Sequence, residues 1–326
     1  MGISVVRYRT GSSQQSYWGV LSNGRVHELQ MDTDQHIDVM QYYFADPAGF
    51  RGNIAEQWVS ADALEWLSPV SKRTQLFCQG LNYADHRSET GLSADFEDTE
   101  NLIFMKSPSS ICGPNDAIVR PAGCKLLDYE IELALVLRRD ITTPCSIGEE
   151  RLKDYIGALV MANDVSARDV MFGAPMLQWF KGKSARTFCP MGPVLYLLDE
   201  QDFYRLYDLQ LTLTLNGVVR QQATTAHLIH KPAKTLSDIS AFSDLNAGDC
   251  VLTGTPGGVL AGASLKTALA IVLNMRNDAR RRQKFTQAQL SAARFLQPGD
   301  VLELKIQSSD GSIDLGKQSS RIVDES

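Results

Sequence analysis

The fold of this chain is best read from the stretch DYEIELALVL at residues 128–137. Successive side chains of a strand point to opposite faces, so Glu130 and Glu132 project side by side, and Ala134 and Val136 continue that face. Two carboxylates that enter a half-buried face repel each other and lose hydration, which is tolerated where a cation or a proton shares the site. The stretch therefore predicts either a metal-binding strand or the hydrated end of an edge strand.

Similar apolar or alternating runs fill the chain from Gln75 onward, and Gly-Pro or Pro-Gly pairs separate them. Few long helical periods intervene, so the pattern favours an α+β, strand-rich body over a doubly wound parallel sheet. The expected strands cover residues 129–137, 156–162, 194–197, 209–215, 250–253 and 301–306.

Residues 1–70 differ from the rest in their pattern of apolar and polar residues. This difference predicts a small N-terminal domain that ends near Ser68-Pro69. Short alternating segments at 4–8 and 18–21 predict strands, and residues 36–44 and 54–67 are helix-like. The remaining residues, 75–326, form the expected larger domain.

A helical insertion at about 262–293 interrupts this larger domain. Its basic cluster predicts either a solvated helix face or a contact with a partner or second subunit. The cluster comprises Arg276, Arg280, Arg281, Arg282 and Lys284.

The composition excludes several classes of protein. The 326 residues are 44% hydrophobic with a net charge of −6, which argues against a nucleic-acid binder because such a protein needs a basic face. Apolar runs fall far short of the ~20 residues that span a bilayer, and the N-terminus lacks the apolar core of a signal peptide. The six cysteines show no C-x-x-C pair, which indicates reduced thiols. We expect a cytoplasmic protein.

A third carboxylate, Asp164, lies in the sequence NDVSARD at residues 163–169, directly after the apolar run 156–161. Polar side chains at the exit of a strand commonly line a site. Ligands that are all oxygen favour Mg²⁺, Mn²⁺ or Ca²⁺ over Zn²⁺. The alternative for Asp164 is an N-cap of the following helix.

Other segments contain candidate catalytic groups. His86 and Glu89 lie three residues apart and share a face if the segment is helical, which suits a water-activating base or an ordinary exposed pair. Lys183 follows Gly182 and is either a surface lysine or a charge near the site. The turn TGTPGGV at residues 253–259 offers free N–H groups for a carboxylate, or serves only as a turn.

Taken in order, these segments resemble the fumarylacetoacetate hydrolase family over residues 77–323. The chain departs from the family pattern at Met171, where members often have Gln, and at Arg186, where many have Asp. The resemblance rests on GLNYADHRSE at 80–89, FMK at 104–106, GP at 113–114, DYEIEL at 128–133, NDVSARD at 163–169, GKS at 182–184, GP at 192–193, NG at 216–217, LNAGD at 245–249, TGTPGGV at 253–259 and LQPGD at 296–300.

The resemblance implies a mixed β-roll catalytic domain, usually a homodimer, with a Mg²⁺, Mn²⁺ or Ca²⁺ ion held by Glu130, Glu132 and Asp164. It also implies that His86 and Glu89 lie on a lid over a small anionic 2-oxo acid.

The leading hypothesis for its activity is metal-dependent hydrolysis of a carbon–carbon bond in a small 2,4-dioxo acid of the acylpyruvate or fumarylacetoacetate type, as in aromatic catabolism. In this hypothesis His86 with Glu89 activates water and Lys183 opposes oxyanion charge. The residues expected to contact the substrate are Tyr83, Arg168, Gly254 and Thr255.

Two other enzyme activities remain open for the same site: decarboxylation of a 2-oxo dicarboxylate such as oxaloacetate, and isomerisation of a 2-hydroxydienoate. A metal-stabilised binding protein without turnover is the non-enzyme alternative. Its motivation is Met171, Arg186 and the basic insertion.

Overall fold

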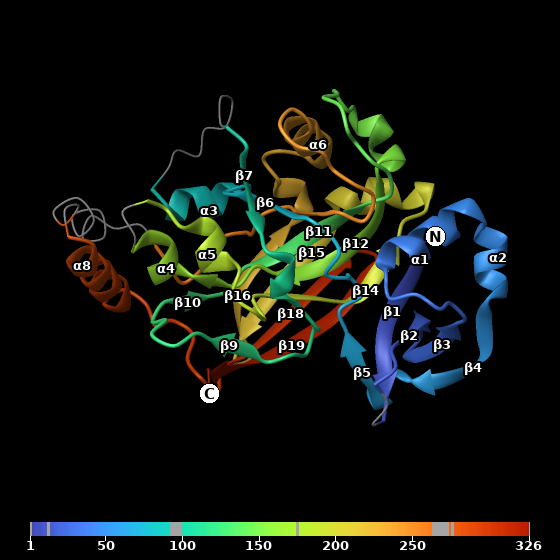
Figure 1. The fold of residues 1–326 in the computed structure, drawn as a ribbon, viewed down its shortest axis with the longest axis horizontal. Coiled ribbons are helices and arrows are strands. Elements are labelled where there is room, and N and C mark those ends of the chain that lie inside the picture. Colours follow the sequence, from blue (N-terminus) through green and yellow to red (C-terminus); the bar gives the residue numbers. More distant parts are fainter. Residues whose placement is uncertain are drawn as a thin grey trace.

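Two mixed β-sheets dominate the molecule, and short helices surround them (Figure 1). The structure is a computed structural model that describes residues 2–11, 14–91, 100–173, 176–262, 274 and 277–325. The strand-rich α+β prediction is confirmed. No helix among these residues is long and apolar enough to cross a membrane.

The larger sheet has twelve strands, and β11 lies in its interior between β12 and β17. In spatial order its main path is β4 (Ile54–Ser60), β3 (Arg25–Leu29), β2 (Tyr17–Ser22), β1 (Ile3–Thr10), β14 (Cys189–Leu197), β12 (Ile156–Asn163), β11 (Ile131–Leu137), β17 (Cys250–Leu252), β6 (Leu76–Gly80) and β7 (Leu102–Lys106). Off this path, β5 (Leu64–Leu67) pairs with β1 and β8 (Ile111–Cys112) pairs with β14.

The smaller sheet packs across the larger one. Leu133 and Leu135 of β11 share one apolar cluster with Leu211 and Leu304 of the smaller sheet, which places a core between the two layers. Ala134 and Val136 point the other way, into a second cluster. Because both faces of β11 are covered, its sequence is almost continuously apolar. The smaller sheet runs β16 (Val218–Thr224), β15 (Leu209–Leu215), β18 (Val301–Ser308), β19 (Asp314–Asp324) and β9 (Ile118–Arg120), and β10 (Leu127–Asp128) pairs separately with β13 (Ser166–Ala167).

The helices are short and lie around the sheets. Figure 1 places the N-terminal strands at one end of the molecule and α8 at the other. The α-helices are α1 (His36–Ala45), α2 (Pro47–Gly52), α3 (Ala84–Glu89), α4 (Arg168–Phe172), α5 (Trp179–Lys183), α6 (Pro232–Ser240) and α8 (Asp278–Leu290). The 3₁₀ turns are η1 (Ala61–Ala63), η2 (Pro108–Ser110), η3 (Glu149–Asp154), η4 (Glu200–Tyr207) and η5 (Thr225–His227).

The expected helix over residues 54–67 is wrong, because this segment forms strands β4 and β5. Strand β4 pairs with β3, with Val26 opposite Val59 and His27 opposite Trp58. The guanidinium of Arg25 also lies 4.2 Å from the ring centroid of Trp58. Pairing with a strand some thirty residues away overrides a local period that is compatible with a helix.

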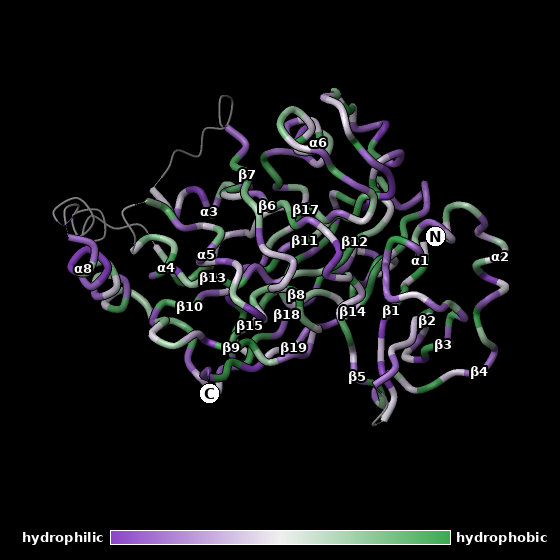
Figure 2. The backbone as a smooth tube through the Cα atoms, viewed as in Figure 1, coloured by the Kyte–Doolittle hydropathy of each residue, from purple (hydrophilic) through white to green (hydrophobic). Residues whose placement is uncertain are grey.

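Helix α8 begins at Asp278, inside the expected insertion. Figure 2 shows it as mainly hydrophilic. Arg280, Arg282 and Lys284 are exposed, whereas Arg281 is buried and donates to the carbonyl oxygen of Gly173 at 3.3 Å. Arg276 and most of the preceding part of the predicted insertion lie outside the described residues.

Candidate active site

Three carboxylates from two neighbouring strands meet at one end of the larger sheet. Glu132 lies on β11, Glu130 directly precedes that strand, and Asp164 directly follows β12. The backbone N–H of Asp164 donates to the carbonyl oxygen of Glu130 at 2.8 Å, which holds the two segments in register. One carboxylate oxygen from each residue lies within 4.8 Å of the other two, and all three residues are buried. The spacing that singled out Glu130 and Glu132 thus places Glu132 on a covered strand and Glu130 directly before it.

Buried cations surround these carboxylates. The Lys183 ammonium lies 2.7 Å from Glu130 Oε2 and 2.5 Å from Asp164 Oδ2. The Arg168 guanidinium pairs with Glu130 and, at 3.0 Å, with Asp128. Lys183 is therefore no surface lysine, and Arg168 joins Glu130 to Asp128 through one ionic hydrogen bond to each.

Burial and the neighbouring charges shift the pKa values of Glu130 and Glu132 in opposite directions. Burial disfavours the Glu130 anion, yet Arg168 and Lys183 outweigh it and hold the pKa of Glu130 well below its usual range. Burial, with Asp164 and Glu130 nearby, raises the pKa of Glu132 well above its usual range. Burial likewise disfavours the Lys183 cation, but Asp164 and Glu130 raise its pKa overall.

Glu132 makes the cluster fit a divalent cation. Within the described part of the chain it forms no salt bridge, and its Oε2 accepts only the backbone N–H of Gly254, at 2.8 Å. The buried hydroxyl of Tyr83 also lacks a hydrogen-bond partner among these residues. An uncompensated carboxylate within an all-oxygen donor set matches the chemistry of Mg²⁺, Mn²⁺ or Ca²⁺.

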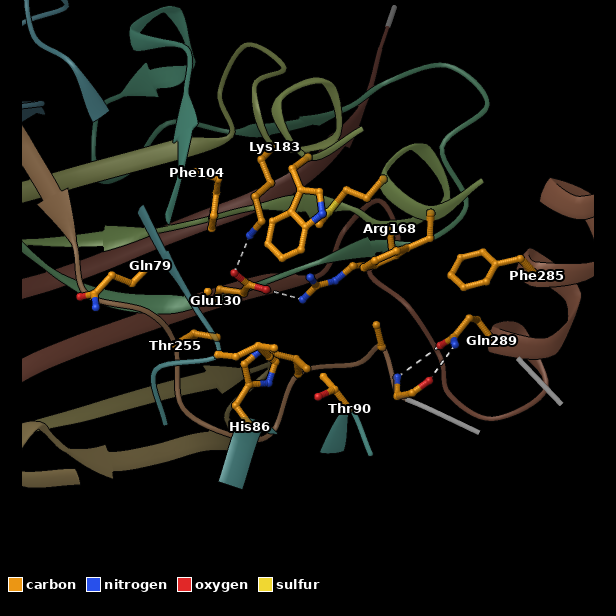
Figure 3. A pocket seen from close by; sticks show the side chains of 18 residues that line it. Gln79, His86, Thr90, Phe104, Glu130, Arg168, Lys183, Thr255, Phe285 and Gln289 are labelled. Atoms are coloured by element: carbon orange, nitrogen blue, oxygen red, sulfur yellow. Dashed lines mark hydrogen bonds and ion pairs between the residues drawn. The ribbon is translucent and has the colours of Figure 1, made fainter. Parts of the chain in front are cut away.

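The predicted His86–Glu89 pair forms on helix α3. His86 Nδ1 lies 3.4 Å from Glu89 Oε2, while Glu89 Oε1 accepts the N–H of Gly258 at 2.7 Å. Glu89 therefore links α3 to the turn that follows β17. His86 is 7% exposed and lines the same cavity as Glu130 and Lys183 (Figure 3).

This cavity has a volume of about 340 Å³ and has two chemically different parts. Its charged lining consists of Glu130, Arg168 and Lys183, with His86 opposite them in Figure 3. The other part, which we call the apolar wall, consists of Phe104, Met171, Phe172, Trp179, Val259 and Phe285.

The expected substrate-contacting residues fall in different places. Arg168 and Thr255 line the cavity, whereas Tyr83 and Gly254 are not among its lining residues. Gly254 has a φ of +87°, and a Cβ there would lie 2.9 Å from Asn82 Cβ, so this position suits glycine. Its N–H donates to Glu132 rather than into the cavity.

The two residues that depart from the family pattern, Met171 and Arg186, lie in different parts of the structure. Met171 lines the cavity and is fully buried. Arg186 does not line it and lies instead in another groove, which Arg7 and Arg9 also line. The alternative interpretation of Asp164 as a helix N-cap is wrong, because the N-cap of α4 is Ala167.

The sequence analysis missed the roles of two buried residues. The Lys106 ammonium lies 2.6 Å from Asp164 Oδ1 and also donates to the carbonyl oxygens of Val165 and Phe188. The Asp128 carboxylate accepts hydrogen bonds from the Arg168 guanidinium and from the backbone N–H groups of Leu260 and Ala261. Both residues belong to motifs that carry the family resemblance, so the motifs marked their positions but not their partners.

Comparison with known proteins gives the family of most of this chain. Residues 75–323 match the model of the fumarylacetoacetate (FAA) hydrolase C-terminal family. A bovine (Bos taurus) protein named oxaloacetate tautomerase FAHD2A, mitochondrial, is 35% identical over 194 residues, 60% of this chain and 59% of its own. A Dictyostelium discoideum fumarylacetoacetate hydrolase domain-containing protein 2 homolog is 34% identical over 57% of this chain and 61% of its own. The match thus spans about three fifths of these relatives.

Solved structures extend the similarity to the whole fold. The fumarylacetoacetate hydrolase of Exiguobacterium antarcticum superposes with a TM-score of 0.73 at 25% identity, covering 99% of this chain and 100% of its own. A 2-hydroxyhepta-2,4-diene-1,7-dioate isomerase from Mycobacterium marinum, at 22% identity, has a TM-score of 0.67 over 99% of both chains and shows the shared fold alone. The matched motifs, the family model and the superposed fold agree: the chain belongs to the fumarylacetoacetate hydrolase family.

Proposed function

We propose that this protein is a divalent-metal-dependent hydrolase that cleaves a carbon–carbon bond in a small 2,4-dioxo acid. The observation that carries this proposal is the position of the His86–Glu89 pair, which lines the same cavity as Glu130 and Lys183. Hydrolysis needs a base for water beside a site that binds the 2-oxo acid, and His86 beside the charged part of this cavity supports that arrangement.

The ion held by Glu130, Glu132 and Asp164 would supply Lewis acidity toward the oxygens of the 2-oxo acid. His86 directs Nδ1–H at Glu89, which leaves Nε2 to accept a proton from water. The oxygen of that water attacks the carbonyl carbon at position 4 of the substrate. The bond between carbons 3 and 4 then breaks, and carbon 3 is protonated to give a 2-oxo acid and a carboxylic acid.

Lys183 supports the same reaction electrostatically. It is buried, and the adjacent carboxylates of Asp164 and Glu130 keep it charged despite that burial. A fixed cation in a site of low dielectric stabilises negative charge that develops on substrate oxygens. Arg168 serves as a positioning residue, because its guanidinium pairs with two carboxylates of the protein, those of Asp128 and Glu130.

A product assay tests the proposal. Purified protein with Mg²⁺ or Mn²⁺ should convert acetylpyruvate or a longer acylpyruvate to pyruvate and the matching carboxylic acid. H86A should lower kcat by about 10²–10⁴-fold, the usual contribution of a general base, while calorimetry finds unchanged Mg²⁺ affinity. H227A, at an exposed histidine, is the matched control. Wild-type protein that binds Mg²⁺ and oxalate but turns over no acylpyruvate would contradict the proposal.

The second candidate function is tautomerisation or decarboxylation of oxaloacetate. Its support is the 35% identity to the bovine protein named as an oxaloacetate tautomerase. The same His86 could move a proton between carbon 3 and the 2-oxo oxygen without any attacking water. Turnover of oxaloacetate in the absence of acylpyruvate cleavage would favour this candidate, and detection of CO₂ would separate decarboxylation from tautomerisation.

A further inference from the structure

Among the described lining residues, charged side chains lie in only one part of the cavity. Lys183 and Arg168 already pair with Glu130, and each also pairs with a second carboxylate. Among the described lining residues, His86 is the other ionisable group, and it faces the charged part in Figure 3. The apolar wall itself contains no cation.

The uncharged polar side chains around the cavity are also committed to the protein. Gln79 Nε2 donates to Asn101 and Thr235, at 3.0 and 2.8 Å. The Thr90 hydroxyl donates to the carbonyl oxygen of Arg87 at 2.7 Å, and the Thr255 hydroxyl donates to that of Ile131 at 3.0 Å. A second carboxylate on the substrate would therefore lose its hydration without gaining a donor from these side chains.

Helix α8 completes the apolar wall. Phe285 is buried, and its ring centroid lies 5.8 Å from that of Phe172 on α4. Across the cavity Phe104 and Trp179 form a second ring pair at 5.0 Å. Flat apolar groups bind well between such rings.

The position of α8 is held by polar contacts at several points. Gln289 donates to the carbonyl oxygen of Gly262 at 2.8 Å and accepts its N–H at 3.3 Å, as Figure 3 shows. Arg281 donates to the carbonyl oxygen of Gly173, and Arg282 lies 3.6 Å from Asp169. These contacts tie the helix to the loop after β17 and to α4, so Phe285 is a fixed part of the cavity.

We propose that the acyl group of the substrate is uncharged and apolar, preferably planar, and that Phe285 on α8 selects for it. The proposal rests on the proposed function for the identity of the 2-oxo acid end. It excludes substrates with a carboxylate at the far end, such as fumarylpyruvate, as preferred substrates.

A matched pair of substrates tests the selectivity. Benzoylpyruvate and fumarylpyruvate share the 2,4-dioxo acid end and differ in whether the far end is a ring or a carboxylate. We expect kcat/KM with Mg²⁺ to favour benzoylpyruvate by at least about a hundredfold, since a buried unpaired charge is rejected more strongly than a mere misfit. Equal values, or a preference for fumarylpyruvate, would overturn the proposal.

Substitutions on α8 test the part played by Phe285. F285A should lower the ratio of kcat/KM for benzoylpyruvate to that for acetylpyruvate by about tenfold. F285L, which retains an apolar core residue, should lower it less and covers the case in which F285A fails to fold. F242A, at an exposed phenylalanine outside this cavity, is the matched control and should leave the ratio unchanged. An unchanged ratio in F285L and F285A would contradict the proposal that Phe285 on α8 selects the acyl group.

A binding experiment separates this proposal from the proposed function. Calorimetry with Mg²⁺ should show that phenylpyruvate binds at least tenfold more tightly than 2-oxoglutarate, whether or not the enzyme cleaves any dioxo acid. Tight phenylpyruvate binding without acylpyruvate turnover would contradict the hydrolase activity alone. Equal or tighter binding of 2-oxoglutarate, or no binding of phenylpyruvate, would overturn the proposal that the acyl group is apolar.

Discussion

Lys106 and Glu132 play opposite parts in the same carboxylate cluster. Lys106 is 1% exposed, and its ammonium compensates Asp164 through a hydrogen bond of 2.6 Å. Glu132 is equally buried and forms no salt bridge within the described residues. The cluster therefore contains one carboxylate that costs free energy until a cation binds.

E132Q is expected to separate metal binding from folding. The amide oxygen can still accept the N–H of Gly254, while the buried charge is removed. In EDTA at pH 8 we expect the free energy of unfolding to rise by about 1–3 kcal/mol. Saturating Mg²⁺, at about 100 times Kd, should stabilise the wild type by about 2.7 kcal/mol and the variant very little.

Urea denaturation with and without Mg²⁺ measures both effects of E132Q. E56Q, at an exposed glutamate, is the control and should respond to Mg²⁺ like the wild type. A variant that retains the full Mg²⁺ stabilisation would exclude Glu132 as a ligand.

Helix α5 holds Lys183 in place through close packing on α4. A Cβ added to Gly182 would lie 2.2 Å from Met171 Cγ and 3.1 Å from the carbonyl oxygen of Ala167. We expect G182A to cost about 1–3 kcal/mol of stability and to lower kcat, because α5 must shift with Lys183. Thermal denaturation and steady-state kinetics would measure the two effects.

The double variant G182A/M171A tests whether this close contact is the cause. Removing the Met171 side chain should restore part of the activity lost in G182A, which a double-mutant cycle would detect as coupling. G52A is the matched control, because a Cβ there meets no atom within 4 Å. Additive losses in the cycle would argue against the packing explanation.

Helix α1 is attached to the rest of the protein by a histidine that is held neutral. His36 Nδ1 accepts the N–H of Ser71 at 3.2 Å, and Nε2 lies 2.7 Å from the carbonyl oxygen of Gly248, so Nε2 carries the proton. Burial lowers the pKa of His36 below its ordinary value of 6.5, although the Gly248 carbonyl opposes the shift.

This lowered pKa predicts a loss of stability in acid. Below pH 6.5 the unfolded chain binds a proton that the folded protein excludes, so the free energy of unfolding falls as the pH falls toward the folded pKa. The slope that His36 adds is at most about 1.4 kcal/mol per pH unit. H36Q keeps a donor and an acceptor but cannot titrate here. Denaturation curves at pH 7.5 and 5.5 should show a smaller loss in H36Q, and equal losses would contradict the prediction.

The twelve-stranded sheet joins the N-terminal segment to the catalytic part of the chain. Strand β1 pairs with β14, with Val5 opposite Leu195 and Val6 opposite Val194. Val5 and Leu195 also belong to one apolar cluster. Continuous pairing and a shared core favour unfolding as one unit, even though residues 1–70 differ in sequence texture.

Calorimetry tests this cooperativity. We expect one transition whose calorimetric enthalpy equals the van't Hoff enthalpy. V5A, which opens space in the shared core, should lower the Tm of that single transition through a loss of about 2 kcal/mol. V219A, at an exposed valine, should leave the Tm nearly unchanged. Two transitions, with V5A shifting only one of them, would show independently folding parts.

Features that depend on local periodicity could be predicted from the order of residues alone. The two-residue spacing brought the carboxylates of Glu130 and Glu132 together, and the three-residue spacing placed His86 beside Glu89. Both follow from the geometry of a single strand or helix, which the order of residues along the chain specifies. The ordered motifs also identified the family, because each marks a position at the common site.

Contacts between groups far apart in the sequence depend instead on the folded chain. It turned residues 54–67 into strands and brought Lys106 and Lys183 to Asp164. It also assembled the apolar wall from five separate segments of the chain. Partners tens of residues apart compete for each side chain, and burial and charge compensation in the assembled core select among them. A local sequence pattern does not describe that competition. For this reason the apolar wall of the cavity could be identified only in the folded chain.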